Sequence, residues 1–211
     1  METLGPGTQG VEGPVSDNIL ESIYGSTLEK QLAKFLASIT NQNANSEVLA
    51  NTPRRVLAAL GQMTQGYHED PAKHLLVQFL TSSQDIVVVN GIDFVSLCEH
   101  HLMPFHGTVS VAYVPAGEDG NFKVVGLSKI PRVVDGYARR LQLQERLTHD
   151  IGKAIVDTLK PMGALVRVTS KHGCLTNRGA MKPNAEMTTQ FLSGIFRTDP
   201  TARAEATSLI T

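Results

Sequence analysis

Residues 85–101 read DIVVVNGIDFVSLCEHH, and this stretch decides the fold. Its many β-branched residues predict one or two strands, with Asn90 and Gly91 as the break between them. The strand runs directly into CEHH at 98–101, and a second strand is predicted in GTVSVAYVP, where apolar and polar residues alternate. The sequence therefore places titratable, metal-binding side chains at the end of a predicted strand.

Helical patterns come before these strands. Apolar residues recur every three or four positions from Thr27 to Ile39, which predicts an amphipathic helix. A second helix is predicted to begin at NTPRRVLAAL, with Thr52 as its N-cap and Pro53 in the first helical position. A short third helix is predicted in PAKHLLVQFL at 71–80. The N-terminal part of the chain is therefore expected to be helical.

After the strands, helices and strands alternate again. The elements expected there are a strand in FKVVGL, helices at about 128–140 and 143–160, closing strands in ALVRVTSKHGC and EMTTQFLSGIF, and a helix in DPTARAEATSLI. This order argues for an α+β fold with a largely antiparallel sheet. We expect a disordered tail at 1–17, an N-terminal helical region at 18–82 and the domain that carries the chemistry at 83–211.

The composition excludes several classes of protein. With a formal net charge of −1, no bulk electrostatic attraction favours nucleic acid or an anionic membrane. No apolar run is long enough to span a membrane, and the N-terminus lacks the basic and apolar segments of a secretory signal. Two cysteines do not make a disulfide framework, so we expect a cytoplasmic protein with reduced thiols.

The two cysteines are the first candidates for a functional site. Cys98 and His101 have the Cys-x-x-His spacing of many zinc sites, and Cys174 lies in a second cluster, KHGC. If that cluster is a strand, His172 and Cys174 point to the same face. Four ligands would make a structural zinc site, whereas three would leave a position for water and make a catalytic one. Buried cysteines without a metal are the plainer alternative.

A second histidine beside a ligand favours the catalytic alternative. A structural site needs neither His100 nor Glu99, whereas a hydrolytic site needs groups that carry protons near the metal. We therefore expect His100 and His172 to transfer protons, while no role for Glu99 follows from the sequence.

Basic residues gather at the start of the helix predicted after GLS. Ser128 is the expected N-cap, and Lys129 and Arg132 lie in the first turn, where cations oppose the helix dipole. A bound anion would reverse that penalty, so a phosphate site is one interpretation and a solvated basic turn is the other. Arg178 adds a cation near the second cluster, and Arg55 is either a further contact or an ordinary surface residue.

Gln144 and Glu145 open the next predicted helix, in LQLQERL. An acid in this position suits the helix dipole, which is the structural interpretation. The functional interpretation is a carboxylate that accepts paired N–H donors, such as those on the edge of a guanine base. The sequence by itself does not choose between the two.

Together these motifs resemble the GTP cyclohydrolase I family. The similar stretches are SLCEHHLMPFHGTVSVAYVP, VVGLSKIPRVVDGYARRLQLQERLT, HGCLTNRG and GIFRTDP, which run in the family's order from about residue 25 to the C-terminus. The resemblance implies a tunnelling fold, in which helices pack on one side of an antiparallel sheet. It also implies a ring of subunits, commonly a homodecamer, with the active sites at the subunit interfaces.

The resemblance assigns a role to each candidate residue. Cys98, His101 and Cys174 match the family's zinc ligands, and His100 and His172 match its catalytic histidines. At the guanine ring, the matching residues are Glu145 and Gln144. At the triphosphate they are Ser128, Lys129, Arg132 and Arg178, and Arg55 matches a contact made across a subunit interface. The implied reaction converts GTP to 7,8-dihydroneopterin triphosphate and formate, with zinc activating the water that attacks C8.

Some residues depart from the family's pattern. They are Gly173, Thr176 and Asn177 after the second cluster, and Ala185 and Met187 in KPNAEMTTQF. These departures leave open a relative with changed specificity that acts on another purine or pterin. A pterin- or nucleotide-binding module whose zinc is structural is the alternative from a different class.

Overall fold

The apolar stretch at 85–101 forms one long strand, β2 (Val87–Cys98), in the computed structural model. It pairs with the antiparallel strand β3 (Pro104–Val114), and the register shifts near the middle of β2. Gly91 lies at this irregularity with a φ of +66°, a conformation that favours glycine. The predicted break is therefore a bulge within one strand.

Strands from distant parts of the chain complete the sheet. Its order is β6-β2-β3-β7-β8, with β6 parallel to β2 and the other pairs antiparallel. The added strands are β6 (Leu141–Gln142), β7 (Gly163–His172) and β8 (Met187–Gly194). A smaller sheet, in the order β1-β5-β4, contains β1 (Gln78–Thr81), β4 (Gly117–Glu118) and β5 (Asn121–Val125). The predicted α+β fold with a largely antiparallel sheet is confirmed.

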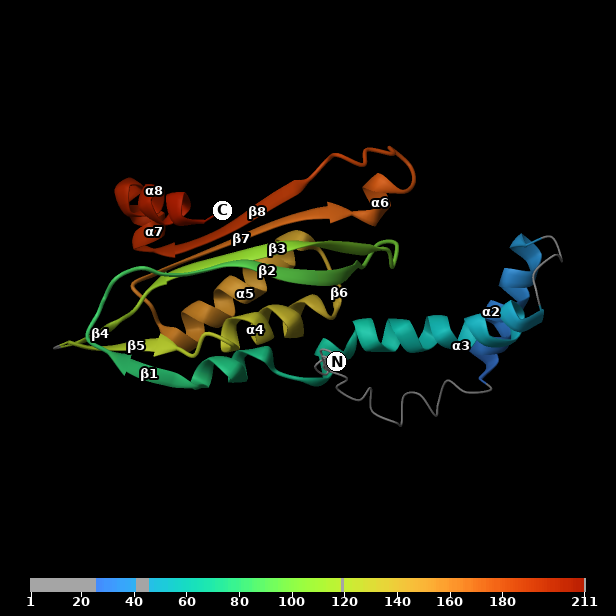
Figure 1. The fold of residues 1–211 in the computed structure, drawn as a ribbon, viewed down its shortest axis with the longest axis horizontal. Coiled ribbons are helices and arrows are strands. Elements are labelled where there is room, and N and C mark those ends of the chain that lie inside the picture. The colour runs from blue at the N-terminus through green and yellow to red at the C-terminus, as the bar shows by residue number, and fades with distance from the viewer. Residues whose placement is uncertain (1–25, 41–45, 119, 211) are drawn as a thin grey trace, which may run out of the picture. The chain divides into compact units, whose positions relative to one another are not determined.

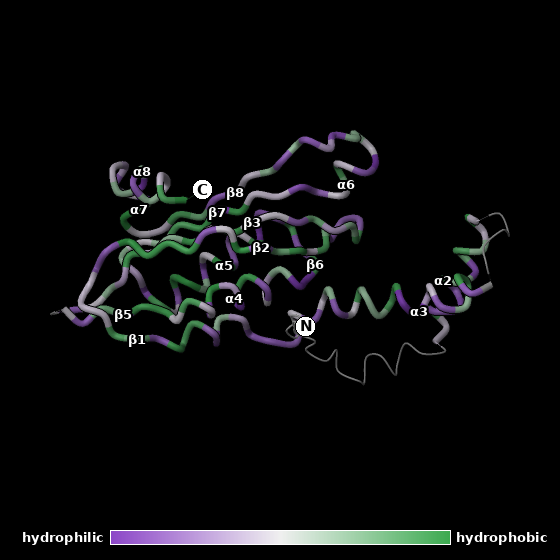
Figure 2. Tube along the Cα trace, viewed as in Figure 1, coloured by the Kyte–Doolittle hydropathy of each residue, from purple (hydrophilic) through white to green (hydrophobic). Residues whose placement is uncertain are grey.

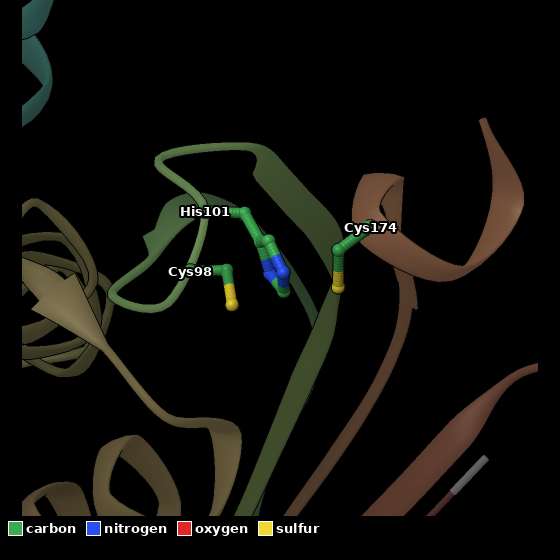
Figure 3. A group of neighbouring side chains, drawn as sticks. All are labelled: Cys98, His101 and Cys174. Atoms are coloured by element: carbon green, nitrogen blue, oxygen red, sulfur yellow. The ribbon is translucent and has the colours of Figure 1, made fainter. Parts of the chain in front are cut away.

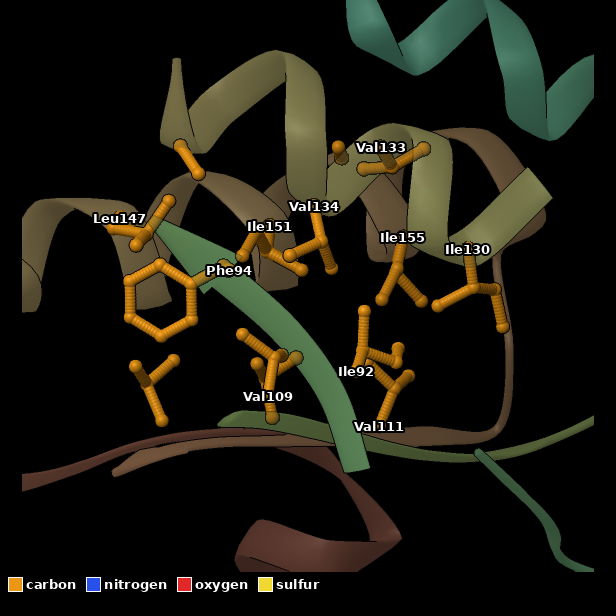
Figure 4. Close-up of a cluster of buried hydrophobic side chains, with 14 of the residues drawn as sticks. Ile92, Phe94, Val109, Val111, Ile130, Val133, Val134, Leu147, Ile151 and Ile155 are labelled. Carbon is orange, nitrogen blue, oxygen red and sulfur yellow. The ribbon is translucent and has the colours of Figure 1, made fainter. Parts of the chain in front are cut away.

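Two long helices, α4 (Lys129–Ala138) and α5 (Gln144–Leu159), pack on one face of the five-stranded sheet (Figure 1). Their apolar side chains meet those of β2 and β3 in the main core, as Figure 4 shows for Val134 and Ile151 above Phe94 and other residues. This arrangement, with helices packed against one side of the sheet, is consistent with the tunnelling fold that was expected.

A second, smaller core lies on the opposite face of the sheet. The short helices α7 (Ile195–Thr198) and α8 (Pro200–Leu209) contribute Phe196 and Ala206, which pack against Leu165 of β7. Figure 2 shows that hydrophobic residues are concentrated along β2 and β3, between the two layers of helices. The central strands are therefore buried on both faces, which holds their ends in place.

The structure describes residues 26–40, 46–118 and 120–210. Contacts within the chain define two units, Met1–Gln62 and Met63–Thr211. The tail predicted at 1–17 lies outside the described residues, and the domain boundary predicted after residue 82 stays a prediction. Across the described ranges, we find no helix that combines the length and the apolar character of a membrane span.

The N-terminal unit contains α2 (Thr27–Ile39), which confirms the first predicted helix, and most of α3 (Ser46–Met63). The predicted start of the second helix is wrong, because α3 begins at Ser46 and takes Pro53 in its interior. Proline is tolerated in a first turn, whereas in a helix interior it removes one backbone hydrogen bond and crowds the carbonyl four residues earlier, at a cost of about 3 kcal/mol. Glu47 occupies the true first turn, where an acid suits the helix dipole.

The segment at 71–80 is also only partly helical. A 3₁₀ helix, η2 (Pro71–Leu76), follows a shorter one, η1 (Gln65–His68), and is capped by the Asp70 carboxylate. The prediction fails beyond Leu76, where the chain becomes strand β1. Backbone pairing with β5, which lies far along the sequence, decides the conformation there.

We expect Gly91→Ala to lower the free energy of unfolding by about 1–2 kcal/mol, because an L side chain is strained at this positive φ. No described atom lies within 4 Å of the added Cβ, so the loss would be conformational and not steric. Gly91→Asn is the matched control, since asparagine tolerates the left-handed region, and should lose less. Urea denaturation measures both, and equal losses would contradict the assignment of a bulge that needs this conformation.

Candidate metal centre

A tight turn at residues 98–103 joins β2 to β3. The Leu102 N–H donates to the Cys98 carbonyl at 2.8 Å, and the Cys98 N–H donates to the Met103 carbonyl at 2.9 Å. Leu102 has a φ of +52°, which is uncommon for a residue with a side chain. The turn thus brings Cys98 and His101 together at the end of the sheet.

The second cluster, KHGC, reaches the same end of the sheet at the end of β7, which is the other strand paired with β3. Strand β7 ends at His172, and Gly173–Thr176 form one turn of helix, α6. The expectation that His172 and Cys174 share one face of a strand is therefore wrong, because the chain coils after His172. Phe105 of β3 pairs with His172, so the turn after β2 and α6 lie at the same end of the sheet.

Cys98, His101 and Cys174 converge from these two segments (Figure 3). One ligand atom from each lies within 4.8 Å of the others, and no other group of three or more metal-binding side chains in the described ranges is this close. Cys98 is buried, Cys174 is half-buried and His101 is exposed. The group is therefore held by the protein on one side and open to solvent on the other.

The two thiols suit a divalent cation. Burial raises the pKa of the Cys174 thiol, and the neighbouring Cys98 thiol raises it further. Arg178 acts in the opposite direction and lowers it. Two thiols that oppose each other's ionisation, with an imidazole alongside, form a donor set that a soft divalent ion such as Zn²⁺ would stabilise as thiolates.

His172 lies beside this group but its ring is held elsewhere. The ring stacks on Phe105 with centroids 4.5 Å apart and planes 3° apart. Its Nε2 lies 2.8 Å from Oε1 of Gln144. Burial lowers the pKa of His172, while the Glu145 carboxylate raises it. His172 is thus an oriented imidazole next to the metal-binding group and not a member of it.

Gln144 determines which nitrogen of His172 carries the proton. Its amide Nε2 donates to the carbonyls of Val168 and Met187, at 3.0 and 2.9 Å, so its oxygen must face the other way. That oxygen accepts from Ser170 and lies against His172 Nε2. Because an amide oxygen only accepts, neutral His172 carries its hydrogen on Nε2 and keeps a lone pair on Nδ1.

His100 and Glu145 are both exposed near the centre. The His100 ring lies 6.2 Å from that of His101 and nearly perpendicular to it. Glu145 lies in the first turn of α5, where it affects His172 electrostatically. It also lines a pocket of about 370 Å³ together with Thr148 and residues of β8.

Among the residues predicted at the phosphates, Arg178 lies close enough to Cys174 to lower the pKa of its thiol, whereas the others lie on α4 and α3. Ser128 is the N-cap of α4, without a side-chain capping bond, and Lys129 and Arg132 follow in its first turn. The far end of α4 leads into β6, which pairs with β2 at Cys98. Ten helical residues rise about 15 Å, so Ser128 and Lys129 are one helix length from that end, and Arg132 is about 9 Å from it. Arg55 lies on α3, in the N-terminal unit.

A family sequence model described as GTP cyclohydrolase I matches residues 28–211. The chain is 43% identical to "GTP cyclohydrolase 1" of Geobacillus sp. over 84% of this chain and 92% of that protein. It is 45% identical to the protein of the same name from Leptospira biflexa, over 87% of this chain and 97% of that protein. With the protein of that name from Bacillus subtilis it shares 40% identity, over 88% of this chain and 95% of that protein.

The chain belongs to the GTP cyclohydrolase I family. Gly173, one departure from the family pattern noted above, has a structural explanation in this member of the family. It is buried at the start of α6, and a Cβ there would lie 2.8 Å from the backbone oxygen of Pro104. The absence of a side chain therefore allows α6 to approach β3 closely enough to present Cys174.

Several residues that shape this family member's site were not identified from the sequence. Phe105, Ser170 and Thr189 hold His172 and Gln144 through contacts between distant strands, which leave no local pattern. Arg146 did carry a signal. A cation in the first turn of α5 opposes the helix dipole, which indicates a nearby acid. That acid is Glu99, which forms an ion pair with Arg146.

We expect Gly173→Ala to weaken metal binding, because the added methyl group must displace the start of α6 and with it Cys174. Overpacking of this kind lowers the free energy of unfolding by about 1–3 kcal/mol. The stabilisation by added Zn²⁺, measured as a shift in melting temperature, should shrink. Thr176→Ala, on the same helical turn, is the control and should keep the full shift. An unchanged shift in Gly173→Ala would contradict this account of α6.

Proposed function

We propose that this chain catalyses the zinc-dependent conversion of GTP to 7,8-dihydroneopterin triphosphate and formate, the first step of pterin and folate biosynthesis. Membership of the GTP cyclohydrolase I family, with relatives of that name at 40–45% identity, supports the reaction. The convergence of Cys98, His101 and Cys174 is the single structural observation that carries the proposal. It would supply the metal site that hydrolysis of the guanine ring requires.

Cys98, His101 and Cys174 would hold the zinc ion. Three protein ligands favour a catalytic site over a structural one, because a tetrahedral ion keeps one position for a non-protein ligand. When bound, zinc would lower the pKa of a water molecule and so supply the nucleophile for C8 of the guanine base. The exposure of His101 supports this, since substrate and water can reach that side of the group.

His172 and His100 would move the protons of the reaction. The lone pair on Nδ1 of His172 is free of the Gln144 contact and can accept a proton while the ring keeps its orientation. The lowered pKa of His172 favours the neutral, accepting form near neutral pH. His100 is exposed and adjacent to a ligand, so it can donate to a leaving group as the imidazole ring of the base opens.

Glu145 would anchor the guanine base. Its carboxylate is exposed at the edge of a pocket and close enough to His172 to raise that residue's pKa. A carboxylate can accept both N–H donors of the guanine edge. Gln144 would contribute through His172 instead of touching the base, because its side chain is 1% exposed and already bonded on both ends.

The triphosphate would be bound by Ser128, Lys129 and Arg132 at the start of α4, with Arg178 and Arg55. Ser128 and Lys129 lie at the end of α4 that is about 15 Å from β6, the strand beside Cys98, which supports a site that two or more subunits share. We therefore propose a homo-oligomeric ring, with ten subunits as expected, in which one copy supplies the metal and another supplies phosphate contacts. A cytoplasmic location, consistent with two free thiols, is part of the same proposal.

Incubation of the zinc-loaded protein with GTP should release formate and yield a pterin that fluoresces after oxidation. A chelator should abolish both.

His100→Ala should keep zinc and lower kcat by about 10²–10⁴-fold, as expected for loss of a proton-transfer group. Cys174→Ala should lose zinc and turnover together. His106→Ala, an exposed histidine on β3, is the control. Zinc-loaded oligomer without formate release would refute the function.

A mixing experiment tests the shared site. His100→Ala and Arg132→Ala should each be nearly inactive alone, because each lacks one half of the site. When the two variants are dissociated, mixed and reassembled, some interfaces combine an intact His100 with an intact Arg132 and activity should return. No recovery from hetero-oligomers whose formation is verified by mass spectrometry would show that one chain carries the whole site.

A further inference from the structure

Glu99 lies within the metal-binding turn, between Cys98 and His100, and makes two contacts with the segment that begins α5. Its backbone N–H donates to the carbonyl of Gln142 at 3.1 Å. Its carboxylate forms an ion pair with the guanidinium of Arg146. The backbone and the side chain of Glu99 therefore both connect the turn to residues 142–146.

Arg146 is arranged around this contact. Its Nε donates to Oε1 of Gln142 at 2.9 Å, and the nitrogen that meets Glu99 also donates to the Leu141 carbonyl at 3.1 Å. The hydrogen bond to Glu99 is the main cause that raises the pKa of Arg146. A planar guanidinium can serve several acceptors at fixed angles, which an ammonium group cannot.

Gln142 connects this pair to the interior. It is 2% exposed, and its Nε2 donates to the Tyr137 carbonyl at 3.1 Å, so its oxygen faces Arg146. Its backbone belongs to β6, which pairs with β2 with Gln142 opposite Cys98. Arg146 thus bonds to a group that α4 and the sheet already hold fixed.

The turn needs such support. Leu102 adopts a φ of +52°, and residues in this region persist where the surrounding structure over-determines them. The cation of Arg146 is also unfavourable in the first turn of α5 unless an acid offsets it. Glu99 therefore relieves the charge at the start of the helix, and the helix in turn fixes Glu99.

We propose that Glu99 and Arg146 form a clamp that positions the metal-binding turn against the start of α5. One side of the clamp carries Cys98, His100 and His101, and the other carries Gln144 and Glu145. It therefore sets the separation between the metal ligands and the groups that orient His172 and anchor the base. The part about the base rests on the proposed function, whereas the part about the metal does not.

The clamp acts on position more than on stability. Both side chains are partly exposed, at 44% for Arg146 and 30% for Glu99, and exposed ion pairs contribute little to the free energy of unfolding. Residues that orient metal ligands typically change metal affinity or activity by about 10–100-fold when they are lost. A variant that folds normally but binds metal less tightly is therefore the expected signature.

Zinc affinity, measured by competition with a chromophoric chelator and without GTP, tests the clamp. Glu99→Gln and Arg146→Gln should each weaken binding about tenfold. The melting temperature of the metal-free protein should stay unchanged in Glu99→Gln, whereas it should fall in Arg146→Gln, which also removes the donor to the buried Oε1 of Gln142. The double variant should lose no more than either single variant, because the two residues act as one unit. Lys153→Gln is the control, since it removes an exposed ion pair with Asp157 on the same helix.

The absorption of the cobalt-substituted protein gives a second readout. The visible bands of Co²⁺ bound by two thiolates should shift or broaden in Glu99→Gln, because the ligands in the turn are less well fixed, and remain unchanged in Lys153→Gln. Wild-type zinc affinity and spectrum in Glu99→Gln would overturn the clamp. Losses that multiply in the double variant would overturn it too, because the residues would then act independently.

GTP kinetics separate this inference from the proposed function. In metal-saturated Glu99→Gln, kcat should fall about tenfold while KM changes little. The reason is that zinc and the guanine base both still bind, but their relative position is less suited to the reaction. An unchanged kcat would contradict the part of the proposal that concerns the base. If the wild-type protein does not turn over GTP, the proposed function fails, and the zinc and cobalt measurements still decide the clamp.

Discussion

The pairing of β3 with both of its neighbours is the constraint on which the rest of the structure depends. Leu97 pairs with Pro104, and Phe105 pairs with His172, so β2 and β7 reach the same end of the sheet. The two segments that carry the cysteines begin there. A slip of one residue in either register would turn the paired side chains to the opposite face. The candidate metal centre is thus a product of strand register, which the two cores on either face of the sheet keep in place.

Polar groups at the start of α5 connect that register to the chemistry. Gln144 is buried and bonded on both ends, and an unsatisfied amide in its position would cost about 1–3 kcal/mol. It fixes the ring of His172 from one side, while the contact of Arg146 with Glu99 holds the turn from the other. Gln144 and Arg146, two residues in the first turn of α5, therefore contact both halves of the site.

The sequence predicts those features that depend on neighbouring residues. The strand before Cys98, the α+β order of elements and the presence of two metal-binding clusters all follow from local spacing, whereas the placement of helices on one side of the sheet was implied by the resemblance to the family. The helical turn after His172 does not follow from local spacing, because it is placed by its close approach to β3. The start of α3 at Ser46 does not either, because Pro53, which marks a first turn in the local pattern, lies inside the helix. The role of Glu99 could not be derived either, since its partner lies 47 positions along the chain.

Zinc-edge X-ray absorption of the resting, zinc-loaded protein tests most directly whether this centre is catalytic. The structure predicts two sulfur ligands at about 2.3 Å, one imidazole at about 2.0–2.1 Å and one light ligand that is not a protein side chain. Added GTP or a GTP analogue should change the signal of that fourth ligand alone. A second imidazole, from His172 after it leaves Gln144 or from His100, would contradict the open site and indicate a structural zinc.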